Sequence, residues 1–248
     1  MLTAYDHPLA RLVDRAGVDI VLVGDSLANV VLGLDSTVEV GIEAMVHHTK
    51  AVVRGVEHAY VVADMPFEAY QIPGSDAVRH ARRLVEEAGC GAVKVEWFGN
   101  SPGFGAGEVT RALRAAGIEV MGHVGLTPQT AREFRVQGRD TASARAIIEQ
   151  AKVFEAEGCF SVVLECVPEA LAAEITRTLK IPTIGIGAGK FCDGQVLVLH
   201  DMLGLNDRKV PTFVKKYADT SALIIDAVRQ YREEVQNGSF PDDAHTFH

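Results

Sequence analysis

Three acidic residues stand where short apolar runs of the sequence end. They are Asp25 after residues 20–23, Asp64 after residues 60–63, and Glu96 after residues 92–95. In parallel α/β folds the carboxyl ends of the strands face the ligand site, so we expect these side chains to converge. Three neighbouring carboxylates repel one another unless a cation lies between them. Because oxygen ligands suit Mg²⁺ better than Zn²⁺, the sequence predicts a magnesium site at Asp25, Asp64 and Glu96.

A lysine is embedded in the run that ends at Glu96. Lys94 precedes Glu96 by two residues, so on a strand both side chains point to the same face. There a protonated Lys94 could neutralise an oxyanion. The alternatives are an outward lysine with its ammonium in solvent, or a Schiff-base lysine. Nearby carboxylates and a metal would keep Lys94 protonated, which disfavours the Schiff base.

Two further candidates follow later apolar runs. Glu165 ends residues 162–165, and a carboxylate partly buried there could take a proton from carbon. The alternative for Glu165 is a structural ion pair with an arginine. His123 follows Gly122 and could act as a second acid or base, or donate a hydrogen bond to the ligand.

Composition excludes several other classes of protein. The chain has 248 residues and a formal net charge of −9. It contains no cluster of Lys and Arg, which argues against nucleic-acid or anionic-membrane partners. No apolar run approaches the roughly 20 residues of a membrane span, and the amino terminus does not resemble a secretory signal. The four cysteines form no CxxC pair, so we expect buried, reduced thiols in a cytoplasmic protein without structural zinc.

Eight short apolar runs alternate with segments of helical periodicity. The predicted strands are residues 1–4, 20–23, 60–63, 92–96, 120–123, 161–165, 182–186 and 195–199. Several predicted helices end in a glycine shortly before the next strand, as at Gly17 and Gly89. This order predicts a single (β/α)8 TIM barrel over residues 1–248. An open doubly wound sheet would need a glycine-rich turn after its first strand, whereas residues 185–189 (GIGAG) follow the seventh strand, where barrels often bind an anion.

Ten short stretches, in order along nearly the whole chain, resemble the ketopantoate hydroxymethyltransferase family. They are residues 1–6 (MLTAYD), 23–26 (VGDS), 35–37 (DST), 63–67 (ADMPF), 93–96 (VKVE), 122–129 (GHVGLTPQ), 136–139 (VQGR), 164–168 (LECVP), 185–189 (GIGAG) and 192–195 (CDGQ). The chain departs from the family pattern in a shorter stretch at residues 130–135. It also differs at residues 97–107, which we expect to form a mobile loop on the side of the active site.

The resemblance implies a barrel of the phosphoenolpyruvate mutase and isocitrate lyase superfamily, assembled as a homo-oligomer, usually a decamer. It implies the first committed step of pantothenate synthesis, in which 5,10-methylenetetrahydrofolate gives a one-carbon unit to 3-methyl-2-oxobutanoate and 2-dehydropantoate forms. By the same resemblance Mg²⁺ is held by Asp25, Asp64 and Glu96, and Glu165 is the catalytic base. The implied substrate-binding residues are Asp25, Ser26, Asp64, Lys94 and His123, with Ser26 on the substrate carboxylate.

Two alternative functions make different demands on the sequence. A Mg²⁺-dependent carbon–carbon lyase of the same superfamily, acting on a 2-oxo or 2-hydroxy acid, would place a catalytic cysteine near the fourth strand, in a loop of the Lys-Lys-Cys-Gly-His type. The chain has no such run. A non-catalytic barrel would be expected to lose the carboxylates at the strand ends, and all of them are present.

Overall fold

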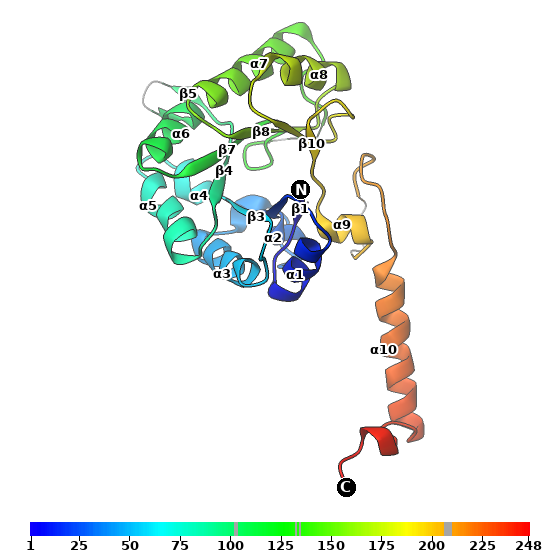
Figure 1. Cartoon of the computed structure of the whole chain (residues 1–248). Helices are drawn as coiled ribbons and strands as arrows, with labels where there is room; N and C mark the ends of the chain where they lie inside the picture. The colour runs from blue at the N-terminus through cyan, green and yellow to red at the C-terminus, as the bar shows by residue number, and fades with distance from the viewer. Residues whose placement is uncertain (102–103, 132, 134, 206–209) are drawn as a thin grey trace. The chain divides into compact units, whose positions relative to one another are not determined.

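The fold is built on one sheet of parallel strands. The computed structural model describes residues 1–101, 104–131, 133, 135–205 and 210–248. Eight strands pair in the order β1-β2-β3-β4-β7-β8-β9-β10, each parallel to its neighbour (Figure 1). Their bounds are β1 (Leu2–Thr3), β2 (Ile20–Val23), β3 (Tyr60–Asp64), β4 (Ala92–Glu96), β7 (Glu119–Gly125), β8 (Ser161–Glu165), β9 (Thr183–Ile186) and β10 (Gly194–Gln195). The predicted α/β class and strand order are confirmed.

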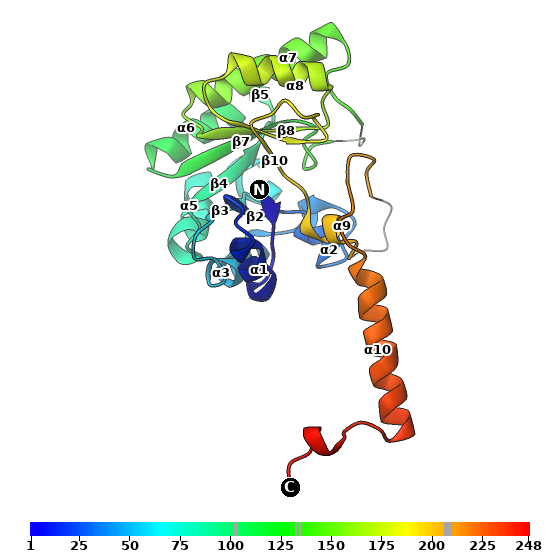
Figure 2. The ribbon, with the colours of Figure 1, turned by 45° about the vertical axis from the view of Figure 1, so that its right-hand side comes forward.

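Helices follow most of these strands and cover the outer face of the curled sheet (Figures 1 and 2). Those that pack on the strands are α1 (His7–Arg15), α3 (Ile42–Val53), the π-helical η2 (Arg83–Glu87), α6 (Ala106–Ala115), α7 (Thr141–Ala156) and α8 (Glu169–Thr178). Between them along the chain stand α2 (Leu27–Val30), η1 (Thr37–Glu39), α4 (Phe67–Tyr70) and α5 (Ala77–Arg82). Part of the predicted loop at 97–107 is instead a short antiparallel pair, β5 (Asn100–Ser101) with β6 (Phe104–Gly105). Pro102 lies outside the described residues.

The inner face of the sheet carries one layer of apolar side chains. Six of the strands, β2, β3, β4, β7, β8 and β9, contribute one residue each to this layer, and Val196 joins them from just after β10. The six residues are Leu22, Val62, Ala92, Met121, Val163 and Ile184. The strands bury side chains on both faces, which explains why their sequences are continuous apolar runs rather than alternating ones. This layer fixes the positions of the strand ends above it.

Polar side chains fix the segments around α1. Asp6 caps the helix by accepting a hydrogen bond from the backbone N–H of Leu9 at 2.8 Å. Asp14, on the same helix, accepts hydrogen bonds from the backbone N–H groups of Glu57, His58 and Ala59 at 2.7–3.1 Å. These bonds to the charged form lower the pKa of Asp14. Asp14 therefore anchors the connection that leads into β3.

The chain divides into two compact units, residues 1–198 and 199–248. The second unit contains α9 (Leu199–Leu203), α10 (Thr220–Asn237) and η3 (Asp243–His245). No residue of α10 is buried, and its exposed apolar side chains are Leu223, Ile224, Ile225, Val228, Tyr231 and Val235. The prediction of one domain over residues 1–248 stays a prediction. Among the described residues no helix has the length and apolar character to cross a membrane.

Candidate active site

The predicted site residues lie at the carboxyl ends of neighbouring strands. Asp64 is the last residue of β3, Glu165 the last of β8, and Asp25 follows β2 by two residues. The parallel register places Asp64 beside Lys94 and Glu96 beside His123. The sheet therefore brings together side chains that are far apart in the sequence, as the prediction of a shared strand-end site requires.

Asp64 is the centre of the first set of contacts. Its Oδ2 accepts a hydrogen bond from the backbone N–H of Asp25 at 2.9 Å, and its Oδ1 lies 3.0 Å from Nζ of Lys94. Both side chains of this ion pair are almost completely buried. Lys94 thus points inward with its charge paired, and the alternative of an outward lysine with its ammonium in solvent is wrong.

His123 is the centre of the second set. Its Nδ1 lies 3.4 Å from Oε1 of Glu96 and 3.3 Å from Nζ of Lys94, and its Nε2 lies 3.2 Å from Oε2 of Glu165. Burial and Lys94 oppose the protonation of His123, but its contacts with Glu165 and Glu96 outweigh them and raise its pKa to about 9. The imidazole therefore lies between the carboxylates of Glu96 and Glu165, which favour its protonated form.

Burial concentrates negative charge in the site. Asp25 is 5% exposed and Glu96 is 1% exposed. Burial, together with the nearby charges of Asp64 and Glu96, raises the pKa of Asp25 to about 8. Burial opposes the charge on Lys94, yet the same carboxylates raise its pKa well above its usual value. Three acidic side chains thus meet two cationic ones in a buried space, and the raised pKa of Asp25 reflects this crowding.

Glu165 and Ser26 are more open than these residues. The Glu165 side chain is 17% exposed, and Ser26 is partly exposed. Oγ of Ser26 lies 2.8 Å from the phenol oxygen of Tyr5, which is buried. These two side chains can therefore meet a ligand while their neighbours remain out of solvent.

The backbone turns sharply immediately after Glu165. Cys166 has φ 49, in the left-handed region that non-glycine residues rarely adopt. Its N–H donates to the carbonyl of Ile186 at 2.9 Å, and its carbonyl accepts from the N–H of Gln137 at 2.8 Å. On the neighbouring strand Gly125 has φ 95, and a Cβ there would lie 2.3 Å from the carbonyl oxygen of Glu165. A glycine is thus required where β7 meets this turn.

A group of three buried residues, to which the sequence analysis gave no role, supports the carboxylates through one member, Gln129. Tyr70, Gln71 and Gln129 are buried and hydrogen-bonded to one another. The Gln129 side chain donates to Oδ2 of Asp25 at 2.8 Å, and its backbone N–H donates to Oε2 of Glu96 at 3.0 Å. The available signal was the position of Gln129 four residues beyond the end of β7, in the stretch GHVGLTPQ.

The metal prediction is neither confirmed nor contradicted by this arrangement. Among the described residues no group of three or more His, Cys, Asp or Glu side chains is found that could hold a metal ion. The oxygens of Asp25, Asp64 and Glu96 face protein donors, as described above. The assignment of these three residues to Mg²⁺ stays a prediction.

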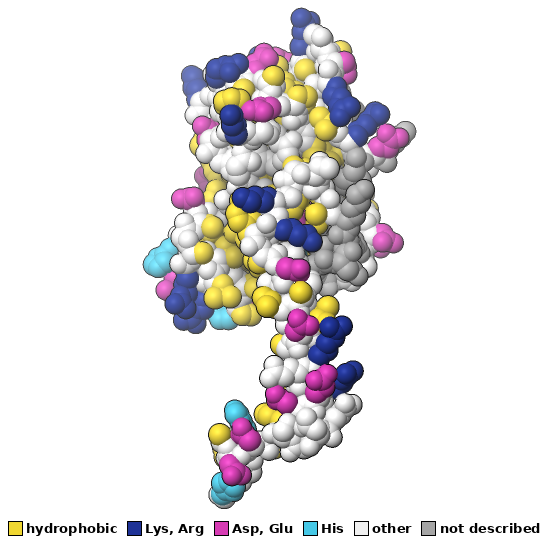
Figure 3. All heavy atoms as spheres, turned by 90° about the vertical axis from the view of Figure 1, so that its right-hand side faces the viewer, with side chains coloured by type: hydrophobic (Ala, Val, Ile, Leu, Met, Phe, Trp, Pro, Cys, Tyr) yellow, Lys and Arg dark blue, Asp and Glu magenta, His cyan; other side chains and the backbone are white. Residues whose placement is uncertain are grey.

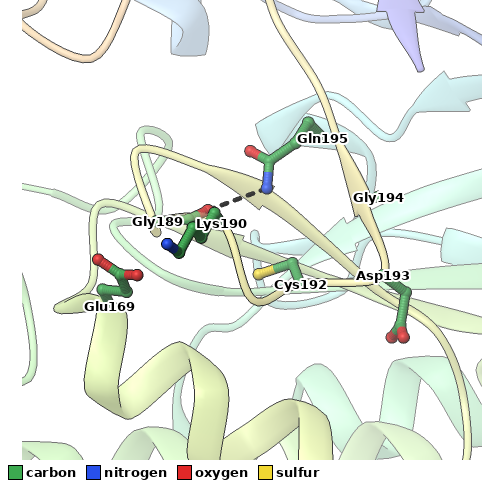
Figure 4. Close-up of a pocket in the computed structure, with 7 residues that line it drawn as sticks. All are labelled: Glu169, Gly189, Lys190, Cys192, Asp193, Gly194 and Gln195. Carbon is green, nitrogen blue, oxygen red and sulfur yellow. Dashed lines mark hydrogen bonds between the residues drawn. The ribbon is translucent and has the colours of Figure 1, made fainter.

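Two pockets lie near the ends of later strands. One, of about 580 Å³, is lined by Glu169, Gly189, Lys190, Cys192, Asp193, Gly194 and Gln195 (Figure 4). Within it Gln195 donates to the carbonyl of Gly189 at 2.9 Å, and none of the predicted site residues lines it. The other, of about 430 Å³, is lined by Gly125, Leu126, Thr127, Thr130, Ala131, Glu133, Arg135 and Gln137. Gly125 pairs with Glu165 in the sheet.

Cysteine and charge patterns agree with the sequence analysis in part. All four cysteines are free thiols, but Cys166 and Cys192 are only partly buried, because both stand in turns beyond strand ends rather than in the core. Figure 3 shows one face of the molecule, on which side chains of both charge signs are interspersed. No extended basic patch appears on that face.

Solved structures resemble this fold at low sequence identity. A phosphonopyruvate hydrolase, determined in complex with oxalate and Mg²⁺, aligns with a TM-score of 0.62 and 12% identity over 98% of this chain and 87% of its own. A 2,3-dimethylmalate lyase, a member of the PEP mutase and isocitrate lyase superfamily, aligns with a TM-score of 0.59 and 14% identity over 99% of this chain and 85% of its own. At these identities the likeness establishes the fold alone.

Sequence relatives are much closer. The 3-methyl-2-oxobutanoate hydroxymethyltransferase of Heliobacterium modesticaldum is 53% identical over 250 residues, covering 100% of this chain and 89% of its own length. The enzyme of the same name from Syntrophus aciditrophicus is 54% identical and is covered to 90%. The family model for ketopantoate hydroxymethyltransferase matches residues 1–243. The chain therefore belongs to the ketopantoate hydroxymethyltransferase family.

Proposed function

We propose that this protein transfers a hydroxymethyl group to 3-methyl-2-oxobutanoate and so forms 2-dehydropantoate, the first committed step of pantothenate synthesis. The one-carbon donor in this proposal is 5,10-methylenetetrahydrofolate. The observation that carries it is the strand-end cluster itself, in which an inward lysine and three buried carboxylates stand beside the more open Glu165. Such a cluster can polarise a 2-oxo acid and remove a proton from it.

In this proposal Glu165 is the base that removes the proton from the branched carbon of the substrate. It is the most exposed carboxylate of the cluster and contacts His123 at 3.2 Å. The contacts of His123 with Glu165 and Glu96 raise its pKa to about 9, which disfavours His123 as the base at pH 7. His123 therefore serves as a hydrogen-bond donor, and Glu165 is left as the group able to accept the proton.

Lys94 and Ser26 bind the polar end of the substrate. Proton loss from carbon leaves negative charge on the keto oxygen, and the ammonium of Lys94 stabilises it. Ser26, whose hydroxyl is oriented by Tyr5, holds the substrate carboxylate. The resulting enolate carbon bonds to the methylene carbon of the folate. Overall one water molecule is consumed: its oxygen becomes the new hydroxyl group, both carbon–nitrogen bonds of the methylene bridge break, and tetrahydrofolate leaves. Burial of the cluster keeps water away from the enolate.

Asp25, Asp64 and Glu96 fit a magnesium ion by their chemistry. They supply hard oxygen ligands, and the raised pKa of Asp25 reflects burial and negative charge that no nearby cation fully compensates. A bound Mg²⁺ would act as a Lewis acid toward the keto oxygen of the substrate. Lys94, Glu165 and Ser26 retain the roles given above.

We also propose that the eight strands close into a (β/α)8 barrel. Leu2 forms a parallel bridge with Leu197, and the N–H of Thr3 donates to the carbonyl of Leu197 at 3.2 Å. These bonds bring β1 to the segment that follows β10, which is what closure requires. We expect the backbone amide of Thr3 to exchange its hydrogen as slowly as that of Val62 in a central strand. Fast exchange at Thr3 but not at Val62 would indicate an open sheet edge.

The remaining parts of the proposal concern assembly and location. A homo-oligomer, expected to be a decamer, is supported by the exposed apolar side chains of α10, such as Leu223 and Val228 at 68% and 60% exposure. Light scattering after gel filtration measures this mass directly. A cytoplasmic location is supported by the free state of all four cysteines.

The deciding experiment measures consumption of 3-methyl-2-oxobutanoate by the purified protein. The assay is run with and without 5,10-methylenetetrahydrofolate, and with and without Mg²⁺. Turnover that requires both supports the whole proposal. Consumption that requires Mg²⁺ but no folate would instead favour the carbon–carbon lyase. An absence of turnover in every condition would contradict the proposed function.

A further inference from the structure

Gln129 makes more contacts with the candidate metal ligands than any function assigned so far explains. It belongs to the connection between β7 and α7, and it is 5% exposed. Its side chain donates to Oδ2 of Asp25 at 2.8 Å, and its backbone N–H donates to Oε2 of Glu96 at 3.0 Å. One residue thus binds two carboxylates that come from different strands.

The amide of Gln129 is itself held from all sides. Nε2 has a second acceptor in the carbonyl of Met65 at 3.0 Å. Oε1 accepts from the hydroxyl of Tyr70 and from Nε2 of Gln71, both at 2.6 Å. Both N–H groups of Nε2 thus face acceptors, and Oε1 faces two donors. If the amide were rotated by 180°, donors would face donors and acceptors would face acceptors. The orientation of Gln129 is therefore fixed independently of any ligand.

Tyr70 extends the same network to the backbone of β4. Its hydroxyl accepts a hydrogen bond from the N–H of Glu96 at 3.0 Å while donating to Gln129. Glu96 is consequently held at both its backbone and its side chain by connected groups. Both hydrogen-bonding atoms of the Gln129 amide and the hydroxyl of Tyr70 have partners, whereas Oε1 of Gln71 has none among the described residues. The arrangement is therefore most tightly fixed at Gln129 and Tyr70.

We propose that Gln129 is a positioning residue that orients Asp25 and Glu96 for a divalent cation. This inference rests on the proposed metal site and deepens it. The residue does not bind the metal; it acts through the two carboxylates, as outer groups commonly do around metal sites.

The test compares Gln129→Met with Gln71→Met in the full-length protein. Both replace a buried glutamine with an apolar side chain of similar length, but Gln71 bonds to Tyr70 and Gln129 and has no contact with the carboxylates. Mn²⁺ alone is the probe, and its binding is measured by calorimetry and electron paramagnetic resonance. We expect Gln129→Met to weaken Mn²⁺ binding by about 10–100-fold. We expect Gln71→Met to change the Mn²⁺ affinity much less, although both variants should lower the melting temperature by a similar amount.

Each other outcome is decisive. Equal loss of Mn²⁺ affinity in both variants, or wild-type affinity in Gln129→Met, would overturn the positioning role while leaving the metal site in place. A wild-type protein that binds no Mn²⁺ would overturn the metal site itself, and the inference with it. If Gln129→Met does not fold, Gln129→Asn replaces it, because its amide is one methylene too short to reach Asp25.

Discussion

The carboxylate of Asp64 binds two groups at once, the backbone N–H of Asp25 at 2.9 Å and the ammonium of Lys94 at 3.0 Å. It thereby joins the ends of three neighbouring strands, β2, β3 and β4. The position of Asp25 depends on this bond as much as on its own strand. Changes at Asp64 are therefore expected to affect both the charge balance and the geometry of the site.

Replacing Asp64 by alanine is expected to abolish turnover and to destabilise the fold. The variant leaves Lys94 buried without its 3.0 Å partner, which costs about 3–5 kcal/mol in the free energy of unfolding. Asp64→Ala combined with Lys94→Met removes the unpaired charge and should recover much of this loss. Urea denaturation of the single and double variants measures it. The control is Glu149→Ala, which breaks the exposed 2.8 Å ion pair with Lys152 and should cost at most about 1 kcal/mol. Equal losses of stability in Asp64→Ala and Glu149→Ala would contradict the prediction.

Glu165→Gln is expected to stop the exchange of the branched-carbon proton of 3-methyl-2-oxobutanoate in deuterated water. The amide keeps the shape of the side chain but cannot accept the proton. Proton NMR of the substrate follows the exchange without requiring folate. Glu169→Gln, a neutralised carboxylate at the exposed start of α8, should exchange at the wild-type rate. Wild-type exchange in Glu165→Gln would show that another group is the base.

Mg²⁺ is expected to stabilise the folded protein. A ligand that binds only the native state at about 100 times its Kd adds about 2.7 kcal/mol, which raises the melting temperature of a chain of this size by roughly 5–10 °C. Differential scanning calorimetry with Mg²⁺ and with EDTA measures the shift. Asp25→Asn should greatly reduce it. A shift of equal size in that variant would place the ion elsewhere.

Asp14→Asn is expected to lower the melting temperature at pH 7. Asp14 accepts three backbone hydrogen bonds, which lower its pKa in the folded state below the ordinary value of 3.8. A lowered folded pKa contributes stability that is present above 3.8 and lost as the pH falls through the folded pKa. The difference in melting temperature between Asp14→Asn and the wild type should therefore become smaller below pH 3.8. If the difference in melting temperature stays constant below pH 3.8, the charge of Asp14 does not have this role. The control is Asp226→Asn in the exposed helix α10.

The strand ends could be predicted from sequence because two local signals coincide there. Short apolar runs such as Ile20–Val23 favour a strand buried on both faces, and the polar residue that follows, here Asp25, marks the carboxyl end. Parallel pairing then places Asp64 next to Lys94 without further information. Strand order and the convergence of the site follow from these local facts.

The supporting network could not be predicted in the same way. Tyr70 lies on a helix of four residues, too short for a periodic signal, and it contacts Gln129 across 59 residues of sequence. The predicted last strand at 195–199 was also too long, since β10 ends at Gln195 and α9 begins at Leu199. In both cases tertiary contacts, rather than local preference, decide the conformation.

The five buried ionisable side chains of the site set a limit on how the protein can be engineered. They are Asp25, Asp64, Lys94, Glu96 and His123. Apolar side chains of similar volume in such positions often give a more stable fold than paired charges do. A library selected for thermal stability alone would therefore tend to enrich substitutions at the residues to which we assign substrate and metal binding. Stabilisation of this enzyme has to be sought away from the strand ends, with activity measured at every round.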